Sequence, residues 1–373
     1  MAAVLLVTQD LQRAGAQRQC VELALGLSRR PGWRVEVVTL TPDGPLAEEL
    51  TAGGVPLVAA HRRWRWDLSP IGRIADRLRG GQFDVLHSLM FLPNFYSRLA
   101  RLRHRPRLVI SSLRSTGIEG VPRYVAEVLM APLCDLIIAN SEAGRRDLIA
   151  KGVAARRLAV VRNGLDLTRF AALASRSQGP TDGPRIGMVA QMEARKDQAG
   201  LVEAFARIAG EFPGARLILA GGGSLRPRVE ASIRRAGLEK RVDLPGTIDR
   251  PELLYGSLDL YVQASASQEG TSNSIIEAMA SGLPVIATDI GGNREVLEHG
   301  VSGLIVPAGR PDRLAASIAS LLGDAALARR LGNAARERAL RLYSRDTMIE
   351  AMIGIYESAL AGAGSRRAPH GGP

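Results

Sequence analysis

The sequence has few of the features that mark membrane, secreted or redox proteins. None of its apolar runs reaches the ~18 residues that a membrane-spanning helix requires. The N-terminal segment MAAVLLVTQD lacks a basic start, which predicts a first strand rather than a signal peptide. The two cysteines, Cys20 and Cys134, belong to no pairing motif. We therefore expect buried thiols in a cytoplasmic protein.

Several motifs that carry chemistry are also missing. The chain has no G-x-x-x-x-G-K-[ST], which argues against a P-loop ATPase, and no G-x-G-x-x-G after the first strand, which argues against a nicotinamide enzyme. It has no C-x-x-C and no histidine cluster, so we expect neither a metal nor a bound cofactor. Aromatic residues make up only 4% of the chain, too few for a stacking pattern that would bind nucleic acid.

Positive charge is concentrated in the first half. Residues 1–165 hold 24 Lys and Arg against 14 Asp and Glu, a net of +10, whereas residues 166–373 carry a net of only +2. A basic half indicates an anionic neighbour, such as nucleic acid, a membrane surface or a phosphorylated substrate. Arginine used freely at solvated positions by a high-GC genome explains the same excess.

Apolar runs alternate with helical spacing in both halves, which predicts parallel sheets covered on both faces. The fold class is therefore α/β, with two doubly wound domains that face each other across a cleft. We expect strands at 3–8, 34–40, 55–59, 85–87, 108–111, 136–139 and 158–161, and again at 185–190, 216–220, 242–244, 258–263, 284–288 and 303–306. Helices are expected at 17–28, 198–208, 225–236 and 314–322.

The domain boundaries follow from composition. The expected order is an N-terminal Rossmann-like domain at 1–170, a linker rich in Ser, Gly and Pro at 171–184, a C-terminal Rossmann-like domain at 185–343, a helix at 344–361, and a disordered tail at 362–373.

The stretch QEGTSNSIIEAMASGLPVIAT, residues 268–288, carries the densest signal. Glu269 follows an expected strand, and Ser274 or Asn273 can cap the helix after it. Backbone N–H groups at such a helix start favour phosphate. Glu277, one turn inside, can accept hydrogen bonds from ribose hydroxyls, and Glu269 can hold a second polyol. The helix dipole alone also favours an acidic residue at Glu277.

The Glu269-x7-Glu277 spacing followed by AMASGLPVIATDIGG resembles the donor site of retaining GT-B glycosyltransferases of family 4, as found in exopolysaccharide and cell-surface polysaccharide synthesis. The segments ANSEAGRRDLIAKGVAARRLAVVRNGLDLTRF, RIGMVAQMEARKDQAGLVEAFARI and LILAGGGSLRPRVE resemble the same family in the same order. The resemblance covers about residues 3–360. It is specific for the family but not for one substrate.

The resemblance implies that the domain at 1–170 binds the acceptor, that the domain at 185–343 binds the nucleotide sugar, and that the helix at 344–361 packs back on the N-terminal domain. It also implies roles for individual residues. Glu277 matches the ribose-binding glutamate, and Glu269 matches the one that contacts the donor sugar. Lys196 matches the lysine that neutralises the diphosphate, where a cation would stabilise the leaving group. His87 matches a histidine that faces the donor sugar. Without the resemblance, Lys196 reads as a solvated lysine and His87 as a structural histidine.

The remaining candidate residues divide between donor and acceptor. Asn94 and Arg114 are expected on cleft-facing loops, in contact with acceptor or phosphate. The chain departs from the family at Gln191, where an arginine is frequent, and at Ala14, where a second glycine is usual before Gly15. The predicted donor or nucleotide contacts are Gly15, Gln191, Arg195, Gly222, Gly270, Thr271, Ser272, Asn273 and Glu277.

The expected activity is transfer of a sugar from a nucleoside diphosphate sugar, with UDP or GDP as the carrier, to an acceptor hydroxyl on a lipid-linked glycan. Retention without a carboxylate nucleophile suggests front-face attack. Alternatives are an epimerase of the same architecture, a transferase with a soluble acceptor, and a basic nucleic-acid-binding protein.

Two basic stretches predict peripheral binding to anionic membrane, on the inner face of the plasma membrane. HRRWRWD, residues 61–67, interleaves Arg with Trp, and RLARLRHRPR, residues 98–107, places Arg98, Arg101 and Arg105 on one expected helical face. Trp favours the headgroup region, and basic residues favour an anionic surface. A solvated basic surface beside a soluble anionic acceptor explains both stretches equally simply.

Overall fold

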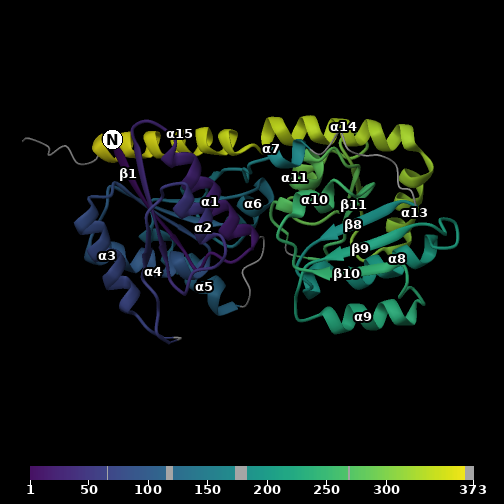
Figure 1. Cartoon of the computed structure of the whole chain (residues 1–373). Coiled ribbons are helices and arrows are strands. Elements are labelled where there is room, and N and C mark those ends of the chain that lie inside the picture. The colour runs from purple at the N-terminus through teal and green to yellow at the C-terminus, as the bar shows by residue number, and fades with distance from the viewer. Residues whose placement is uncertain (65, 115–120, 173–182, 268, 366–373) are drawn as a thin grey trace, which may run out of the picture. The chain divides into compact units, whose positions relative to one another are not determined.

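A computed structural model describes residues 1–64, 66–114, 121–172, 183–267 and 269–365 (Figure 1). The chain divides into two compact units, which are described separately. Unit 1 comprises Met1–Leu165 together with the chain from Arg345, and unit 2 comprises Asp166–Ser344. The first boundary lies five residues before the expected one, because Phe170 packs against Tyr255 inside unit 2.

Unit 1 is built on a parallel sheet with strand order β3-β2-β1-β4-β5-β6-β7 among the described residues. Alternate side chains of β1 enter opposite cores, Val4 and Leu6 on one face and Leu5 and Val7 on the other. This two-residue period explains why strands buried on both faces read as continuous apolar runs. The strands are β1 (Ala2–Thr8), β2 (Trp33–Thr39), β3 (Leu57–Ala59), β4 (Val85–Leu89), β5 (Leu108–Leu113), β6 (Leu136–Ala139) and β7 (Leu158–Val160).

Helices cover both faces of this sheet. Among them, α1 and α15 share one apolar core, and α3 and α4 share the other. Their bounds are α1 (Gly15–Ser28), α2 (Ala47–Ala52), α3 (Ser69–Gly81), α4 (Phe91–Arg103), α5 (Val121–Met130), α6 (Glu142–Ala150) and α15 (Arg345–Ser365), with short 3₁₀ turns at η1 (Ala131–Leu133) and η2 (Ala155–Arg157).

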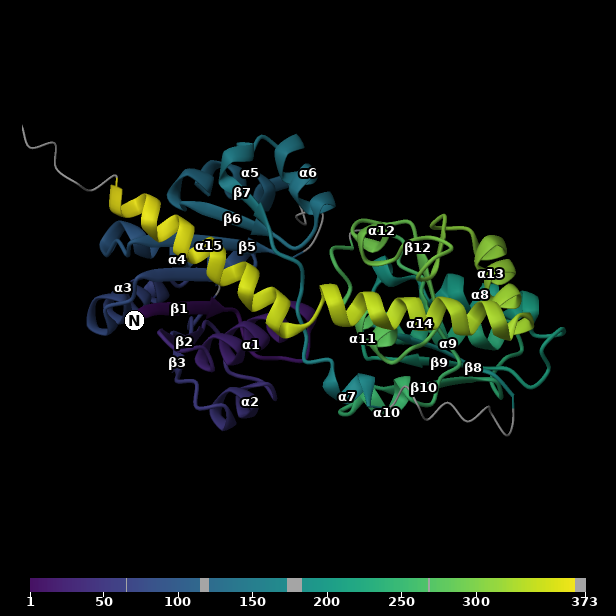
Figure 2. The ribbon, with the colours of Figure 1, turned by 90° about the horizontal axis from the view of Figure 1, so that it is seen from above.

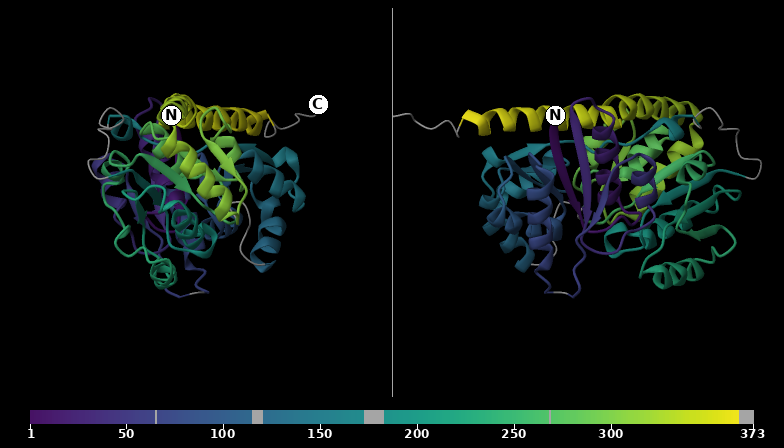
Figure 3. Two further views of the ribbon diagram at one scale, coloured as in Figure 1. Left: turned by 90° about the vertical axis from the view of Figure 1, so that its right-hand side faces the viewer. Right: turned by 60° about the vertical axis from the view of Figure 1, so that its left-hand side comes forward.

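The last helix, α15, completes unit 1. The helix is the long yellow ribbon at the C-terminal end of the described chain (Figures 2 and 3). Met348, Ile349, Met352 and Tyr356 recur in it at helical spacing and are buried in the core shared with α1. The two helices approach closely at Gly26, where an added Cβ would lie 2.4 Å from the Ile349 side chain. The helix extends through Ser365, so residues 362–365 of the expected tail are helical. Residues 366–373 of that tail, and 173–182 of the expected linker, lie outside the described residues.

Unit 2 has a parallel sheet with strand order β10-β9-β8-β11-β12-β13 among its described residues. Helices α8, α9 and α13 pack on one face, and α11 and α14 pack on the other (Figure 2). The strands are β8 (Arg185–Val189), β9 (Arg216–Ala220), β10 (Val242–Gly246), β11 (Leu260–Gln263), β12 (Val285–Thr288) and β13 (Leu304–Val306). The helices are α7 (Thr168–Ala171), α8 (Gln198–Ile208), α9 (Arg226–Arg235), α10 (Pro251–Tyr255), α11 (Asn273–Ala280), α12 (Asn293–Val296), α13 (Pro311–Gly323) and α14 (Ala325–Leu342), with a 3₁₀ turn η4 (Ala194–Lys196).

Candidate active site

The strand order of unit 2 reverses between β8 and β11, which lie side by side although β9 and β10 separate them in sequence. Ligands of doubly wound sheets bind beyond the carboxyl ends of the strands at such a reversal. Here the loop after β8 and the loop after β11 meet, because the Ala266 amide donates a 2.8 Å hydrogen bond to the Arg195 carbonyl. These two loops carry most of the donor-side residues predicted from the sequence.

A buried ion pair joins the two loops. The Lys196 Nζ lies 2.6 Å from Glu269 Oε2, and each side chain is only 8% exposed. Arg195 adds a second cation, with its Nη1 3.7 Å from the same carboxylate oxygen, although its Nε also donates to Glu193. Burial lowers the pKa of Lys196, and the neighbouring Glu269 carboxylate opposes that shift. Such a pair is costly to bury unless further hydrogen bonds complete it.

Hydrogen bonds from behind hold Glu269 in place. Ser265 Oγ donates to Glu269 Oε2 at 2.9 Å, and Gln263 Nε2 donates in turn to Ser265 Oγ. The side-chain amide oxygen Oε1 of Gln263 accepts a 2.8 Å hydrogen bond from the buried Tyr261 hydroxyl. This chain of polar groups runs from the interior of β11 to the carboxylate. It fixes the orientation of Glu269 before any ligand is bound.

The predicted anion-binding helix is α11. It begins at Asn273 with Ser272 as its N-cap, and the Ser272 side chain makes no capping hydrogen bond, so the N-cap is neither of the two expected residues, Ser274 and Asn273. Ser274 instead bonds the Ser272 hydroxyl and the Gln263 side chain. Gly270, Thr271 and Ser272 are buried, whereas Asn273 is half-buried at the first turn.

Glu277 is half-buried one turn inside α11 and accepts a 3.0 Å hydrogen bond from the Tyr255 hydroxyl. Tyr255 is fully buried, and burial together with the Glu277 carboxylate raises its phenol pKa well above the usual value. A phenol that stays protonated can only donate to Glu277, so it orients the carboxylate. Nothing in the local sequence distinguishes Tyr255, and sequence analysis missed it, together with Tyr261, Gln263 and Ser265.

The glycine loop after β9 packs directly against the loop after β8. Gly221 and Gly223 have positive φ, and added Cβ atoms would lie 2.1 Å from the Ala190 carbonyl and 2.5 Å from the Met192 carbonyl. Glycine is required there by both conformation and space. Gly222 accepts a hydrogen bond from the Met192 amide. The side chain of Gln191, a predicted donor contact, is exposed beside this contact.

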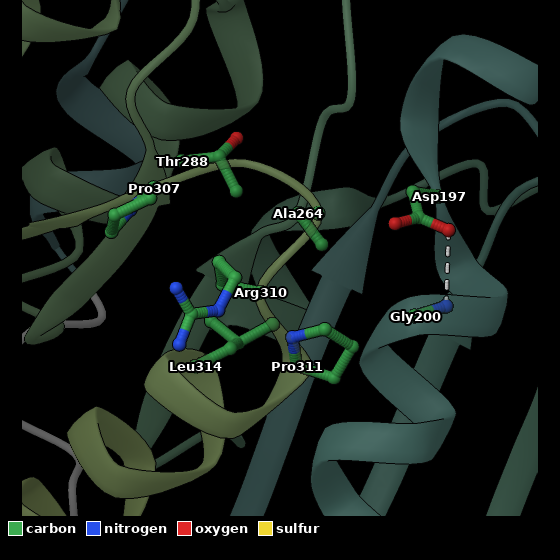
Figure 4. A pocket seen from close by; sticks show the side chains of 9 residues that line it. Asp197, Gly200, Ala264, Thr288, Pro307, Arg310, Pro311 and Leu314 are labelled. Atoms are coloured by element: carbon green, nitrogen blue, oxygen red, sulfur yellow. Dashed lines mark hydrogen bonds between the residues drawn. The ribbon is translucent and has the colours of Figure 1, made fainter.

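A small cavity near the same edge is too small for a nucleotide. It has a volume of about 10 Å³, roughly the room that one water occupies, and is lined by Asp197, Ala264, Thr288 and Arg310, among others (Figure 4). Asp197 caps α8 by accepting from the Gly200 amide at 3.0 Å (Figure 4). The loop residues described above therefore define the candidate site better than this cavity does.

In unit 1, the structure does not place His87 at a strand end. The expected strand 85–87 continues to Leu89, so His87 lies in the middle of β4, paired with Leu6 on β1 and Ile110 on β5. Its ring is fully buried. Nδ1 lies 2.6 Å from the Tyr356 hydroxyl, and Nε2 lies 2.7 Å from Ser112 Oγ. Burial, with a further contribution from the Arg114 charge, lowers its pKa to about 3. Both ring nitrogens have protein partners, so in this structure His87 does not face a ligand as the resemblance implies, and a catalytic role for it stays a prediction.

The two predicted acceptor-side residues are also interior. Asn94 lies in the first turn of α4, not on a loop, and is fully buried between Ser88 and the Ser112 carbonyl. Arg114 directly follows β5 and is 8% exposed, with Nη1 donating to Asn163 at 2.9 Å. Its Nε and Nη2 are buried without a hydrogen-bond partner, and burial lowers its pKa to about 10. The sequence predicts that both side chains face the cleft, but in the structure both are buried. The other N-terminal prediction, Gly15, is exposed at the start of α1.

The second basic stretch does not form the basic helical face that the sequence predicts. Arg98 is 1% exposed and forms a buried ion pair with Glu127, and Arg101 binds Asp135 at 2.9 Å. Arg105 lies beyond the end of α4. The basic helical face predicted there is therefore wrong, because two of its three charges hold α4 to neighbouring elements.

Comparisons with known proteins agree with this geometry. The chain matches the family models "Glycosyl transferases group 1" at residues 172–338 and "Glycosyltransferase Family 4" at residues 13–169. The chain belongs to glycosyltransferase family 4. A D-inositol 3-phosphate glycosyltransferase of Nocardia farcinica is 31% identical over 75% of this chain and 67% of its own length. A phosphatidyl-myo-inositol mannosyltransferase of Mycobacterium tuberculosis is 27% identical over 94% of this chain and 95% of its own.

Solved structures of the same architecture include HepE of Anabaena in complex with UDP, with a TM-score of 0.84 and 22% identity over 96% of this chain and 100% of that one. The GT-B fold class expected from the sequence is confirmed, and the chain is a glycosyltransferase. Within the described residues, no cluster of His, Cys, Asp and Glu is suited to a metal ion. No helix in the described part combines the length and apolarity needed to cross a bilayer. Both cysteines are buried, as expected.

Proposed function

We propose that this family 4 glycosyltransferase uses a nucleoside diphosphate sugar and transfers the sugar, with retention, to a hydroxyl of a lipid-linked glycan in exopolysaccharide or cell-surface polysaccharide synthesis. The observation that carries the proposal is the buried Lys196–Glu269 pair at the strand-order reversal of unit 2. A cation and a carboxylate there serve the two ends of one donor, the diphosphate and the sugar.

The donor residues act in a defined order along the ligand. Glu277, oriented by Tyr255, accepts from vicinal ribose hydroxyls, and the N-terminus of α11 faces the phosphates. Lys196 stabilises the negative charge that develops as the diphosphate leaves. Diphosphate binding draws Lys196 toward phosphate oxygens, which releases the Glu269 carboxylate for sugar hydroxyls. UDP is the favoured carrier, in line with the UDP bound by the HepE neighbour, and GDP is the second choice.

The proposed chemistry is front-face substitution. The acceptor hydroxyl oxygen forms a bond to the anomeric carbon on the face from which the diphosphate leaves. The bond between that carbon and the phosphate oxygen breaks, and the hydroxyl proton passes to the departing phosphate oxygen. Lys196 and the start of α11 supply the electrostatic stabilisation, so no metal is required in this scheme.

The membrane part of the proposal rests on the first basic stretch. Trp64 is 61% exposed and Trp66 is 77% exposed, and Leu68 beside them is also exposed. Arg63 is exposed in the same loop, while Arg65 lies outside the described residues. Exposed tryptophans next to cations suit the headgroup region of an anionic membrane.

A donor panel tests the proposed function. Thermal unfolding is measured with UDP-, GDP- and ADP-sugars, because a ligand that binds the folded state raises the melting temperature. We expect the largest shift with a UDP-sugar, and NMR of the product should show the anomeric configuration of the donor. Release of an epimer or a glycal without acceptor would instead identify an epimerase. Absence of a shift with every donor would contradict the proposal.

The membrane part has its own test. Wild type should pellet with vesicles rich in phosphatidylglycerol at low salt and be released as salt screens the attraction. A Trp64→Ser/Trp66→Ser variant should remain in solution, and an Arg98→Lys/Arg101→Lys variant, which keeps the buried charges, should pellet like wild type. Equal binding of wild type to neutral and anionic vesicles, or binding to neither, would overturn this part.

A further inference from the structure

A groove in unit 1 has no role in the chemistry proposed above, although its residues Arg63 and Trp64 belong to the loop assigned to membrane binding. It has a volume of about 490 Å³ and is lined by Thr41, Arg62, Arg63, Trp64 and Arg123. This volume lies within the range of small-ligand sites, roughly 300–1,000 Å³. Three of the five lining side chains are guanidinium groups, and none is acidic. The groove is therefore an electropositive recess and not simply a basic surface.

The groove lies at the carboxyl edge of the unit 1 sheet. Thr41 follows β2, Arg62 to Trp64 follow β3, and Arg123 lies in α5, which follows β5. The strand order of this sheet reverses between β1 and β4, so the groove draws its residues from both sides of the reversal. Ligands of doubly wound sheets bind at this place.

The loop that carries two of the arginines is held rigidly. The Asp67 carboxylate accepts from the Arg63 amide at 2.7 Å and from the Ser69 amide at 2.8 Å, and these bonds lower its pKa. The Tyr96 hydroxyl donates to the Asp67 carbonyl at 2.7 Å. The Arg62 amide donates to the Leu40 carbonyl, at the end of β2. The backbone is thus fixed, and the arginine side chains extend from a preformed support.

The guanidinium groups of Arg62 and Arg63 do not hold elements of the fold together. Among the described residues, the guanidinium groups of Arg62 and Arg63 have no hydrogen-bond or ion-pair partner, in contrast to Arg98 and Arg101. Guanidinium groups recognise phosphate oxygens through paired N–H donors. Arg123 also lies over the Phe91 ring, 5.8 Å from its centroid.

The backbone beside the groove is strained. Met90, between β4 and Phe91, has φ 77° and ψ 167°, a conformation that is otherwise nearly restricted to glycine. Strain of this kind is found at ligand sites, where the surrounding structure maintains it. Apolar surface flanks the site as well: Trp64 lines it, and Val125 and Leu129 are exposed on α5, the helix that carries Arg123.

We propose that the groove binds the diphosphate of a lipid-linked acceptor, with Arg62, Arg63 and Arg123 on the phosphate oxygens and the exposed apolar residues along the lipid. This inference rests on the proposed function, because it names the part of the acceptor that unit 1 recognises. The groove selects acceptors by an anionic head group, so a neutral glycan lacking the diphosphate binds weakly. Inorganic phosphate shares the same chemistry and binds with lower affinity.

Calorimetric titration with geranyl diphosphate tests the groove in the full-length protein. Saturating UDP is present throughout, so that the unit 2 site is occupied. Arg62→Gln/Arg123→Gln should raise the Kd about tenfold or more, the scale of losing charged hydrogen bonds. Arg105→Gln makes one similar change at an exposed arginine of unit 1 outside the groove, and it should leave the Kd within about twofold of wild type. Geraniol should not bind, and pyrophosphate should compete.

Several outcomes would overturn the inference. The first is that wild type does not bind geranyl diphosphate. The second is that Arg105→Gln raises the Kd as much as the double variant does. The third is that the double variant no longer binds phosphatidylglycerol vesicles but keeps wild-type affinity for geranyl diphosphate. The last result would identify the groove as a contact for membrane headgroups only. UDP binding by the double variant, together with its melting temperature, reports on folding. A wild type that binds geranyl diphosphate but transfers no sugar to a lipid-linked glycan would refute the proposed function. It would leave the assignment of the groove as a diphosphate site intact.

Discussion

The carboxyl edges of the two parallel sheets show opposite uses of polar residues. In unit 2, Lys196 and Glu269 meet in loops beyond the strands, beside half-buried and exposed groups such as Glu277 and Gln191. In unit 1, the side chains of His87 and Asn94 are buried in the interior. His87 is hydrogen-bonded to the Tyr356 hydroxyl, and Asn94 accepts from the Ser88 hydroxyl. A polar residue near a strand end is therefore not by itself a site residue. It matters whether the chain continues as strand beyond it.

The largest expected effect is on turnover when Lys196 is removed. Lys196→Ala should lower kcat by about 10²-fold or more, because one preorganised charge is lost from the leaving group. Steady-state kinetics with the preferred donor measure it. Arg195→Ala should have a smaller effect, since its guanidinium is 3.7 Å from Glu269 and shared with Glu193. A kcat for Lys196→Ala within about twofold of wild type would show that another cation supplies the charge.

A smaller effect is expected on donor affinity at Glu277. Glu277→Gln should raise the donor Kd about tenfold while changing kcat less, because ribose contacts exist in both ground and transition states. Calorimetry with UDP measures the Kd. An unchanged Kd would rule out the ribose contact.

Tyr255→Phe should weaken donor binding less than Glu277→Gln does. The variant removes only the hydroxyl that orients Glu277 and leaves the carboxylate in place, so the expected loss is that of one weak hydrogen bond, about 0.5 kcal/mol or roughly two- to threefold in Kd. The comparison is informative because the carboxylate itself is retained. An effect on Kd larger than that of Glu277→Gln would show that Tyr255 does more than orient it.

At His87 we expect loss of stability without loss of chemistry. His87→Gln should lower the free energy of unfolding by about 1–3 kcal/mol, as its buried hydrogen bonds are disturbed, and leave kcat nearly unchanged below the melting temperature. Urea unfolding and initial rates on the same samples separate the two. A variant of wild-type stability with a kcat reduced by about 10²-fold would restore the catalytic role.

The last prediction concerns pH. His87 has a pKa of about 3 when folded, against about 6.5 in an unfolded chain. Between these values the unfolded chain binds a proton that the folded chain does not, so stability is complete above pH 6.5 and falls as the pH falls. The slope from this group is about 1.4 kcal/mol per pH unit below 6.5. Urea unfolding at several pH values should show a shallower acid loss in His87→Gln, and parallel curves would contradict the assignment.

Much of the fold could be predicted because both cores follow simple periodicities. The strands Arg216–Ala220 and Leu136–Ala139 and the helix Gln198–Ile208 match their expected bounds, since each is a clear apolar run or helical repeat. On the donor side, the resemblance placed Lys196 and Glu269 together. The network behind them could not be predicted, because Tyr255 and Tyr261 read as ordinary core residues until the fold brings them to the site.

The errors have a common physical origin. The expected strand stops at residue 87, yet the strand continues through the polar Ser88, whose hydroxyl donates to Asn94 in the interior. Arg98 was read as exposed because charge usually is, yet Glu127, distant in sequence, neutralises it. Partners far along the chain decide burial, and local spacing does not reveal them.

The return of α15 to unit 1 affects how the protein is made. The side of α1 that packs against α15 stays uncovered until Met348 to Tyr356 have been synthesised, after all of unit 2. At typical elongation rates, the 179 residues from Asp166 to Ser344 occupy the ribosome for roughly 10–35 s. For that time the first-made half of the protein waits as an incomplete domain while the second-made half is able to fold first. A chaperone that binds exposed apolar helices can bind α1 in this interval. Truncation within α15 would impair the folding of residues 1–165, although they lie at the other end of the sequence.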